Sequence, residues 1–213
     1  MSIEIDIFSD VVCPWCFIGT ERLDQVLTKR GIDAKITYHT FLLDPSTPEE
    51  GKNVPEMLKQ RYGRDPKPMF ARVESEARTV GIELDLSKAA MMYPTVRAHT
   101  LLRAAIPLGT QPALSKALFA ANFLEGKNIT DVDTLVDLAT KHGFTAEAAR
   151  AVVTDEAQLA QTRAEQQVPQ KLGISGAPFF IFQRQVAVSG AQPVDVFNQV
   201  LDEALKLPPP PAE

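Results

Sequence analysis

The sequence predicts an α/β protein in which two sheet-forming ends enclose a large, all-helical insertion. Strand-like alternation occurs near the N-terminus and returns only after residue 173, and the pattern between them is helical. Neither end alone supplies enough strands for a stable sheet, so we expect the two ends to pair. The expected domains are a discontinuous α/β domain (1–45 and 172–207), an inserted helical domain (50–168) and a proline-rich tail (208–213), which we expect to be disordered.

The first forty residues are expected to form a strand–helix–strand unit. Residues 3–7 alternate isoleucine with acidic residues, which is the period of a strand. A helical pattern then runs to Gly31, and a second alternation follows at residues 34–39. The segment Cys13-Pro14-Trp15-Cys16 stands at the junction of the first strand and the helix.

Prolines and turn residues divide the rest of the chain into elements. Helices are expected in the insertion at 66–81, 95–106, 112–126 and 132–142, with one helix or two at 145–167. Two short strands and a closing helix are expected after it, at 179–182, 186–188 and 194–207.

Composition and charge exclude several classes of partner. The formal net charge of −5 and the absence of a Lys/Arg run argue against nucleic-acid binding. No segment approaches the roughly 18 consecutive apolar residues that a membrane span needs, so we expect no membrane partner. The N-terminus begins with Met1 and has no basic segment followed by an apolar run, which predicts a cytoplasmic protein without a signal peptide.

Two cysteines, Cys13 and Cys16, are the only ones in the chain. A secreted disulfide scaffold would carry more of them, spread along the sequence. A structural zinc site needs four ligands, and the three histidines show no ligand spacing (His39, His99 and His142). We therefore predict no metal and favour redox chemistry, with a metal site shared between subunits and two inert cysteines as the alternatives.

The position of the motif assigns different roles to the two thiols. Cys13 would open a helix, where unpaired N–H groups and the helix dipole favour a thiolate. In C-x-x-C motifs this lowers the thiol pKa from about 8.5 to roughly 3.5–7.5. Cys16, one turn later, would be shielded and would attack a mixed disulfide formed at Cys13. Pro14 suits the first helical turn, and neither Pro14 nor Trp15 carries a charge.

Pro178 is the second informative feature, at the entrance to an apolar strand. Proline is disfavoured there unless the strand is an edge or has a special geometry. Composition alone favours an ordinary loop proline over a cis peptide bond.

Two distant segments together resemble the DsbA-like branch of the thioredoxin superfamily: residues 9–19, SDVVCPWCFIG, and residues 173–180, GISGAPFF. Three more segments are similar to the narrower FrnE-type group of polyketide-biosynthesis dithiol–disulfide isomerases, namely 41–45, 93–99 and 189–193. The resemblance covers nearly the whole chain. It implies a thioredoxin fold with a helical insertion between the second and third strands.

The resemblance also implies a site. Pro178 would be cis and would pack against the cysteines as the third catalytic residue. Its loop would hold substrate through the backbone of Ala177, and Pro14 and Trp15 would contact substrate from the motif.

The chain departs from the pattern of this superfamily in two ways. Ile7 stands six positions before Cys13, where secreted DsbA-like proteins and thioredoxins carry an acid, and neither Asp6 nor Asp10 is a secure substitute. A second, C-terminal cysteine pair, present in some family members, is missing.

The predicted function is a thiol–disulfide oxidoreductase or isomerase acting on protein or small-thiol partners. No cofactor is expected, although glutathione is a candidate co-substrate. The first alternative is a glutathione-dependent isomerase or transferase of the kappa-class or 2-hydroxychromene-2-carboxylate isomerase type, which generally carries serine and no second cysteine. The second is a non-catalytic binding or chaperone-like module. The sequence sets neither a reduction potential nor an oligomeric state.

Two further residues are candidate substrate contacts. His99 shares a helix face with Thr95 and Leu102 that could line a cleft above the motif, and Phe41 could line an apolar groove. For both residues the alternative is packing in the interior.

Overall fold

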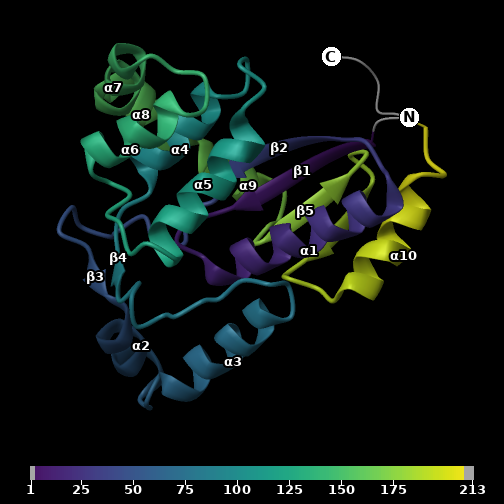
Figure 1. Ribbon diagram of the computed structural model, residues 1–213, viewed down its shortest axis with the longest axis horizontal. Helices are drawn as coiled ribbons and strands as arrows, with labels where there is room; N and C mark the ends of the chain where they lie inside the picture. The colour runs from purple at the N-terminus through teal and green to yellow at the C-terminus, as the bar shows by residue number, and fades with distance from the viewer. Residues whose placement is uncertain (1–2, 209–213) are drawn as a thin grey trace.

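The computed structural model describes residues 3–208, and a four-stranded sheet lies at its centre (Figure 1). Its order is β2-β1-β5-β6, with β1 parallel to β2 and the other neighbours antiparallel. The strands are β1 (Ile3–Ser9), β2 (Ala34–Thr40), β5 (Phe179–Phe182) and β6 (Val186–Ser189). The two ends of the chain thus pair through β1 and β5, as predicted. The tail predicted to be disordered lies, from residue 209 onward, outside the described residues.

Two helices, α1 (Pro14–Arg30) and α10 (Val194–Ala204), cover one face of the sheet (Figure 1). The alternating isoleucines of β1 point toward them, and apolar side chains from both helices complete this part of the core (Leu23, Val26, Phe197 and Leu201 among them). α1 ends at Gly31, whose φ of 61° is the left-handed conformation that glycine adopts most easily. The strand–helix–strand unit predicted for the N-terminus is therefore confirmed.

The insertion between β2 and β5 is helical, with a short two-stranded sheet as its exception. The five helical segments that the sequence predicts are present: α3 (Lys67–Arg78), α4 (Val96–Ala104), α5 (Gln111–Phe123), α6 (Val132–Thr140), and α7 (Ala146–Thr154) with α8 (Glu156–Glu165). The last segment is two helices because Asp155 ends α7 and caps α8, accepting the N–H groups of Ala157 and Gln158.

Four elements of the insertion were not predicted individually. They are β3 (Lys52–Asn53), β4 (Met91–Met92), α2 (Val54–Tyr62) and the short α9 (Gln167–Lys171). β3 and β4 pair with each other only. The Asn53 side chain caps α2 by accepting the Glu56 N–H at 3.0 Å. Val54, Met57, Leu58 and Tyr62 recur at helical spacing along α2, but none of the residues of this helix is fully buried.

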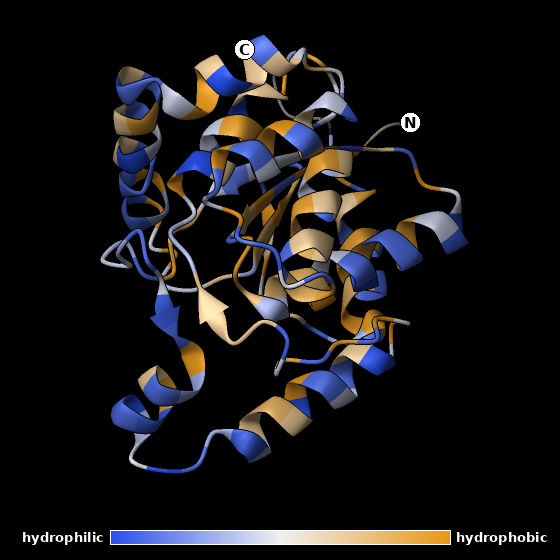
Figure 2. Cartoon of the chain, turned by 60° about the vertical axis from the view of Figure 1, so that its left-hand side comes forward, coloured by the Kyte–Doolittle hydropathy of each residue, from blue (hydrophilic) through white to orange (hydrophobic). Residues whose placement is uncertain are grey.

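Most helices of the insertion fall into two groups (Figure 1). α2 and α3 lie at the lower edge of Figure 1, and α4 to α8 lie at its upper left. Figure 2 shows apolar residues gathered in the central strands and on the helix faces turned inward. A separate apolar cluster fills the space between α1, α3 and α5 and includes both cysteines. The motif is therefore embedded where the inserted helices meet the sheet domain.

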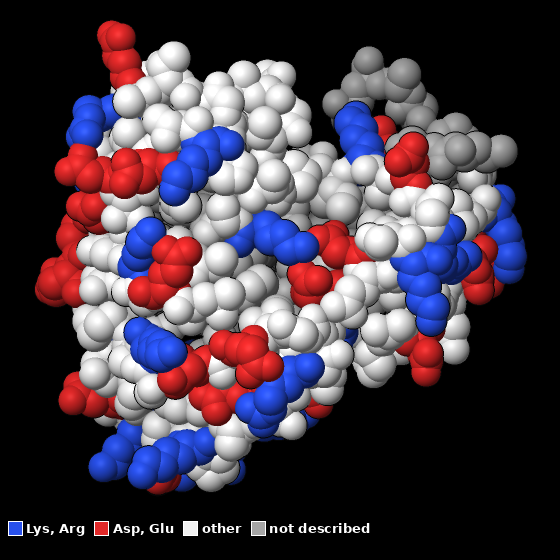
Figure 3. All heavy atoms as spheres, in the orientation of Figure 1, with Lys and Arg blue, Asp and Glu red and all other residues white. Residues whose placement is uncertain are grey.

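On the face drawn in Figure 3, basic and acidic side chains are interspersed, without a large patch of one sign. Within residues 3–208, every helix is too short or too polar to cross a membrane.

Candidate active site

Cys13 and Cys16 lie at the N-terminal end of α1. Cys13 is the N-cap residue, and Pro14 takes the first helical position, where its missing N–H is not needed. The N–H groups of Cys16 and Phe17 both donate to the Cys13 carbonyl oxygen, at 3.0 and 3.2 Å. Both cysteines are free thiols; Cys13 is 4% exposed and Cys16 is fully buried. The motif therefore lies between β1 and α1, at the strand–helix junction that the sequence predicts.

The loop before β5 faces these thiols. The Ala177–Pro178 peptide bond is cis, as the family resemblance implied. The Cys13 Sγ lies 3.9 Å from the Ala177 carbonyl oxygen. The loop is fixed from its other side by the Gly190 N–H, which donates to the Pro178 carbonyl oxygen at 2.8 Å. Structure therefore brings together three segments that are up to 177 positions apart in the chain.

Two residues of α1 hold the Pro178 loop close to the cysteines. Gly19 lets the loop approach, because a Cβ added there would lie 3.2 Å from the Pro178 Cγ. Arg22 is nearly buried and donates to the Ala191 carbonyl oxygen at 2.7 Å, and it also pairs with Glu76 of α3. Neither residue was singled out from the sequence, since their partners lie far along the chain.

The environment of Cys16 keeps it protonated. Burial raises the pKa of the Cys16 thiol well above its usual range, and the neighbouring Cys13 raises it further. A hydrogen bond from the Asp10 backbone opposes this shift. Among the described residues the buried Ser9 hydroxyl has no hydrogen bond of normal geometry, yet it faces Cys16 closely enough to lower the pKa of that thiol. Cys16 is therefore a protonated thiol that must lose its proton before it can attack a disulfide.

This protonation predicts a pH-dependent second step. Because a thiol below its pKa gains about tenfold more thiolate per pH unit, attack of Cys16 on a mixed disulfide at Cys13 should accelerate by about that factor from neutral to mildly alkaline pH. Reduced protein mixed with an aromatic disulfide in a stopped-flow instrument should release its two leaving groups in two phases. The second phase should show this acceleration and should be missing in Cys16→Ser; a pH-independent second phase would contradict the assignment.

A buried pair of side chains supports the motif from behind. The Asp10 carboxylate accepts the Leu43 N–H at 2.8 Å, and its other oxygen lies 3.2 Å from His99 Nε2. Asp10 and His99 are 1% and 3% exposed. The Asp10 carbonyl oxygen accepts the Cys13 N–H at 2.9 Å. This pair ties the turn that carries Cys13 to α4 and to the chain after β2.

Two of the candidate substrate contacts are placed elsewhere. His99 is turned toward Asp10 in the interior and does not line the groove beside Cys13, so its packing interpretation holds. Phe41 is nearly buried and packs in the core against Phe8, Ile174 and Ala177, so its packing interpretation holds as well. Ile7, which occupies the position of the acid in secreted DsbA-like proteins and thioredoxins, lies in the apolar core.

A groove opens directly beside Cys13. It has a volume of about 560 Å³. Its lining includes Cys13, Pro14, Trp15 and Ala177, the residues that the sequence assigned to catalysis or substrate contact, together with side chains of α2, α3, α5 and β4. The structure therefore places the predicted contacts of the motif and of the Pro178 loop along one surface.

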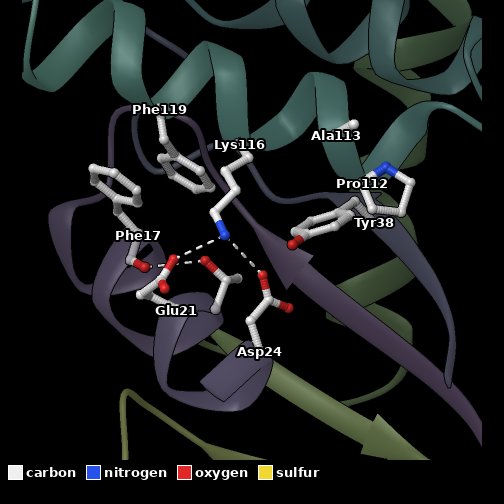
Figure 4. A pocket seen from close by; sticks show the side chains of 9 residues that line it. Phe17, Glu21, Asp24, Tyr38, Pro112, Ala113, Lys116 and Phe119 are labelled. Carbon is white, nitrogen blue, oxygen red and sulfur yellow. Dashed lines mark hydrogen bonds and ion pairs between the residues drawn. The ribbon is translucent and has the colours of Figure 1, made fainter. Parts of the chain in front are cut away.

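A second, smaller hollow lies beside α1 and α5 and contains no cysteine (Figure 4). Lys116 of α5 reaches across it to Glu21 and Asp24 of α1, at 3.0 and 3.2 Å. Burial raises the pKa of Asp24, although Lys116 opposes the shift. Burial also raises the pKa of the adjacent Tyr38. One lysine thus lies between two acids, and the hollow is lined by an ion-pair cluster. Elsewhere in residues 3–208, no group of three or more acids, histidines and cysteines is arranged to hold a metal.

The sheet with its inserted helices, the C-x-x-C pair at a helix start and the cis-proline loop beside it define the thiol–disulfide oxidoreductase class of thioredoxin-like proteins. The family model described as the DSBA-like thioredoxin domain matches residues 4–202, and the chain belongs to this family.

Individual relatives extend along the whole chain. A probable DsbA oxidoreductase of Streptomyces coelicolor is 31% identical, with a TM-score of 0.86 over 99% of this chain and 93% of that one. The Bacillus subtilis (strain 168) protein YwbO, described as uncharacterized, is 26% identical over 97% of this chain and 99% of its own length. A 2-hydroxychromene-2-carboxylate isomerase is 14% identical, with a TM-score of 0.71 over 95% and 96% of the two chains. That last likeness concerns the fold alone.

Proposed function

We propose that this protein exchanges disulfides with protein or small-thiol substrates through the Cys13–Cys16 dithiol, as a cytoplasmic member of the FrnE-type group. One observation carries the proposal: the outer thiol is the N-cap of α1 and lies beside the Ala177 carbonyl. The thiolate is the nucleophile in disulfide exchange, and Cys13 is the thiol that lines the groove.

The exchange would proceed in two displacements. The Cys13 thiolate attacks one sulfur of a substrate disulfide, a new bond forms between them, and the other substrate sulfur leaves as a thiolate. Cys16 then loses its proton and attacks the Cys13 sulfur, which releases the second substrate thiolate and leaves a Cys13–Cys16 disulfide. Two electrons pass from the dithiol to the substrate. The same steps in reverse oxidise a dithiol client. If another substrate thiolate attacks the mixed disulfide before Cys16 does, Cys13 leaves as a thiolate and the substrate keeps a rearranged disulfide, which is isomerisation.

The presence of Cys16 favours this cycle over a glutathione-dependent isomerase or transferase. Such an enzyme has no use for a second thiol one turn behind the nucleophile, whereas a dithiol cycle requires it. The fold is common to both classes, so the chemistry of the site separates them.

Cysteine variants test the proposal. We expect Cys13→Ser to abolish reduction of a disulfide substrate such as insulin, because serine is not a nucleophile at this site at neutral pH. Cys16→Ser should form a mixed disulfide at Cys13 that persists and is detected by intact-protein mass spectrometry. Thr28→Ser, an exposed change on the same helix, is the control and should retain full activity. Full activity of Cys13→Ser would refute the proposal. Turnover of a chromene-type acid with glutathione by Cys16→Ser would support the alternative.

A further inference from the structure

The groove beside Cys13 has an unusual lining. Four of the five methionines in the chain line it, and the fifth is Met1. They come from three elements of the insertion: Met57 from α2, Met69 from α3, and Met91 and Met92 from β4. Methionine is flexible and polarizable and is favoured where an apolar surface must adapt to its ligand. Methionines converging from separate segments therefore indicate a binding surface for an apolar group.

The groove reaches the reacting sulfur. Cys13 and Ala177 are part of its lining, so a ligand held among the methionines lies against the outer thiol and the Pro178 loop. The groove is about 560 Å³, within the roughly 300–1,000 Å³ typical of sites for small organic ligands. This volume favours a small molecule over the surface disulfide of a folded protein.

The charges around the groove are asymmetric. Its acid, Asp44, is paired with Lys52 at 2.5 Å. Its base, Arg61, is exposed and lies over the Tyr62 ring, 5.6 Å from the centroid, and across residues 3–208 it forms no ion pair with an acid. A second cation, Arg72, lies 5.9 Å from the centroid of the Trp15 ring. An anionic group on the ligand would complement this edge of the groove.

We propose that the methionine groove binds low-molecular-weight disulfides that have an apolar or aromatic body and an anionic group, and that it presents their sulfur to Cys13. This inference rests on the proposed disulfide exchange. The reaction is the two-step displacement given above: Cys13 takes one half of the ligand, the other half leaves as a thiolate, and Cys16 then releases the first half. The ligand gains two electrons and the dithiol loses them.

Single-turnover kinetics of the reduced protein separate the contributions. Three disulfides serve as probes: 5,5′-dithiobis(2-nitrobenzoate) is aromatic and anionic, 4,4′-dithiodipyridine is aromatic and uncharged, and bis(2-hydroxyethyl) disulfide is small and polar. The double variant Met57→Gln/Met69→Gln should slow both aromatic disulfides by about tenfold through loss of apolar contact and leave the polar one within about twofold. Met57→Leu/Met69→Leu keeps the apolar lining and should slow the two aromatic disulfides less than the glutamine pair does.

The arginine is tested with a matched charge change on the same helix. Arg61→Gln should slow the anionic probe alone, by about threefold, as expected for an exposed charge contact. Lys59→Gln removes a charge from an exposed position of α2 outside the groove lining and should leave all three rates unchanged. If Met57→Gln/Met69→Gln slows all three probes equally, or slows none of them, the groove assignment is overturned, whereas disulfide exchange by Cys13 and Cys16 still stands. No reaction of the wild-type protein with any probe would refute the exchange itself.

Trp15, the only tryptophan in the chain, gives a binding measurement independent of the chemistry because it lines the groove. In the Cys13→Ser/Cys16→Ser variant, addition of the non-reactive thioether (benzylthio)acetate should change the fluorescence of Trp15, and the change should saturate. Met57→Gln/Met69→Gln in that background should weaken this binding by about tenfold. A fluorescence that stays constant, or affinity indifferent to the methionines, would count against the groove.

Discussion

Replacing His99 by leucine should destabilise the protein by about 3 kcal/mol or more at neutral pH. Leucine fills much of the space of the imidazole but leaves the Asp10 carboxylate, 1% exposed, with only the Leu43 N–H as a partner. Removing one member of a buried hydrogen-bonded pair leaves the other polar group desolvated and unpaired, which is the costly outcome. The free energy of unfolding of the reduced protein, from chemical denaturation, measures the effect.

A double-mutant cycle separates the pair from simple loss of packing. Asp10→Asn removes the charge, so His99→Leu should cost at least about 1 kcal/mol less in that background than in the wild type. His142→Leu is the matched control: His142 is only partly buried and bonds to one backbone carbonyl, so its loss should cost less than about 1.5 kcal/mol. Additive effects of the Asp10 and His99 substitutions would show that the two residues do not act as a pair.

The same substitution should also slow disulfide exchange. Asp10 belongs to the turn whose carbonyl receives the Cys13 N–H, so an unpaired carboxylate there both loosens the turn and places an uncompensated negative charge near the nucleophile. A negative charge disfavours a nearby thiolate. A slower first phase with an anionic or a neutral disulfide alike is the expected result.

The elements that the sequence predicts well are those with a local signature. The alternation in residues 3–7 and the helical period up to Gly31 each lie within a few residues of the structure that they specify. α2 was not predicted individually, although its apolar residues recur at helical spacing; they line a groove, and none of them is fully buried. The type and the ends of an element can thus be predicted from nearby residues when one face of that element is fully buried.

The site required information that no local pattern contains. The helix start marks Cys13 as the outer thiol, but composition alone favoured a trans Pro178, and only the resemblance to a family implied the cis bond. His99 and Asp10 are 89 positions apart, and helical periodicity does not tell which of two apolar surroundings a face will meet. Long-range contacts decide such side-chain roles, which is why His99 and Phe41 are in the core and not at the groove.

The inserted helices contribute to the chemistry as well as to the fold. Apolar residues of α3 and α5 enclose the cysteines, and the resulting burial is the main cause of the raised pKa of the Cys16 thiol. The same helices, with α2, form the wall of the groove. The insertion therefore affects both the pH at which Cys16 becomes a thiolate for the second step and which molecules can reach Cys13 for the first.

Replacing Gly19 by valine should both destabilise the fold and slow exchange. A Cβ at this position would lie 3.2 Å from Pro178 Cγ and from Phe180 Cζ, and 3.3 Å from the Ala191 Cα. Valine adds two methyl groups beyond that Cβ, and extra volume in a packed interior forces neighbours apart at a cost of about 3 kcal/mol. Because the displaced neighbours include the Pro178 loop, the separation between Cys13 and Ala177 should grow.

Two further variants distinguish crowding from helix preference. Gly19→Ala adds only the Cβ, and the gain of about 1 kcal/mol in helix propensity should offset much of its contact cost, so its stability should remain within about 1 kcal/mol of the wild type. Thr28→Val introduces the same branched side chain at an exposed position of α1 and should change neither stability nor exchange appreciably. A Gly19→Val protein that unfolds like the wild type would mean that α1 can move away from the loop without loss. If it unfolds earlier yet exchanges disulfides at the normal rate, the spacing between α1 and the Pro178 loop matters for folding alone.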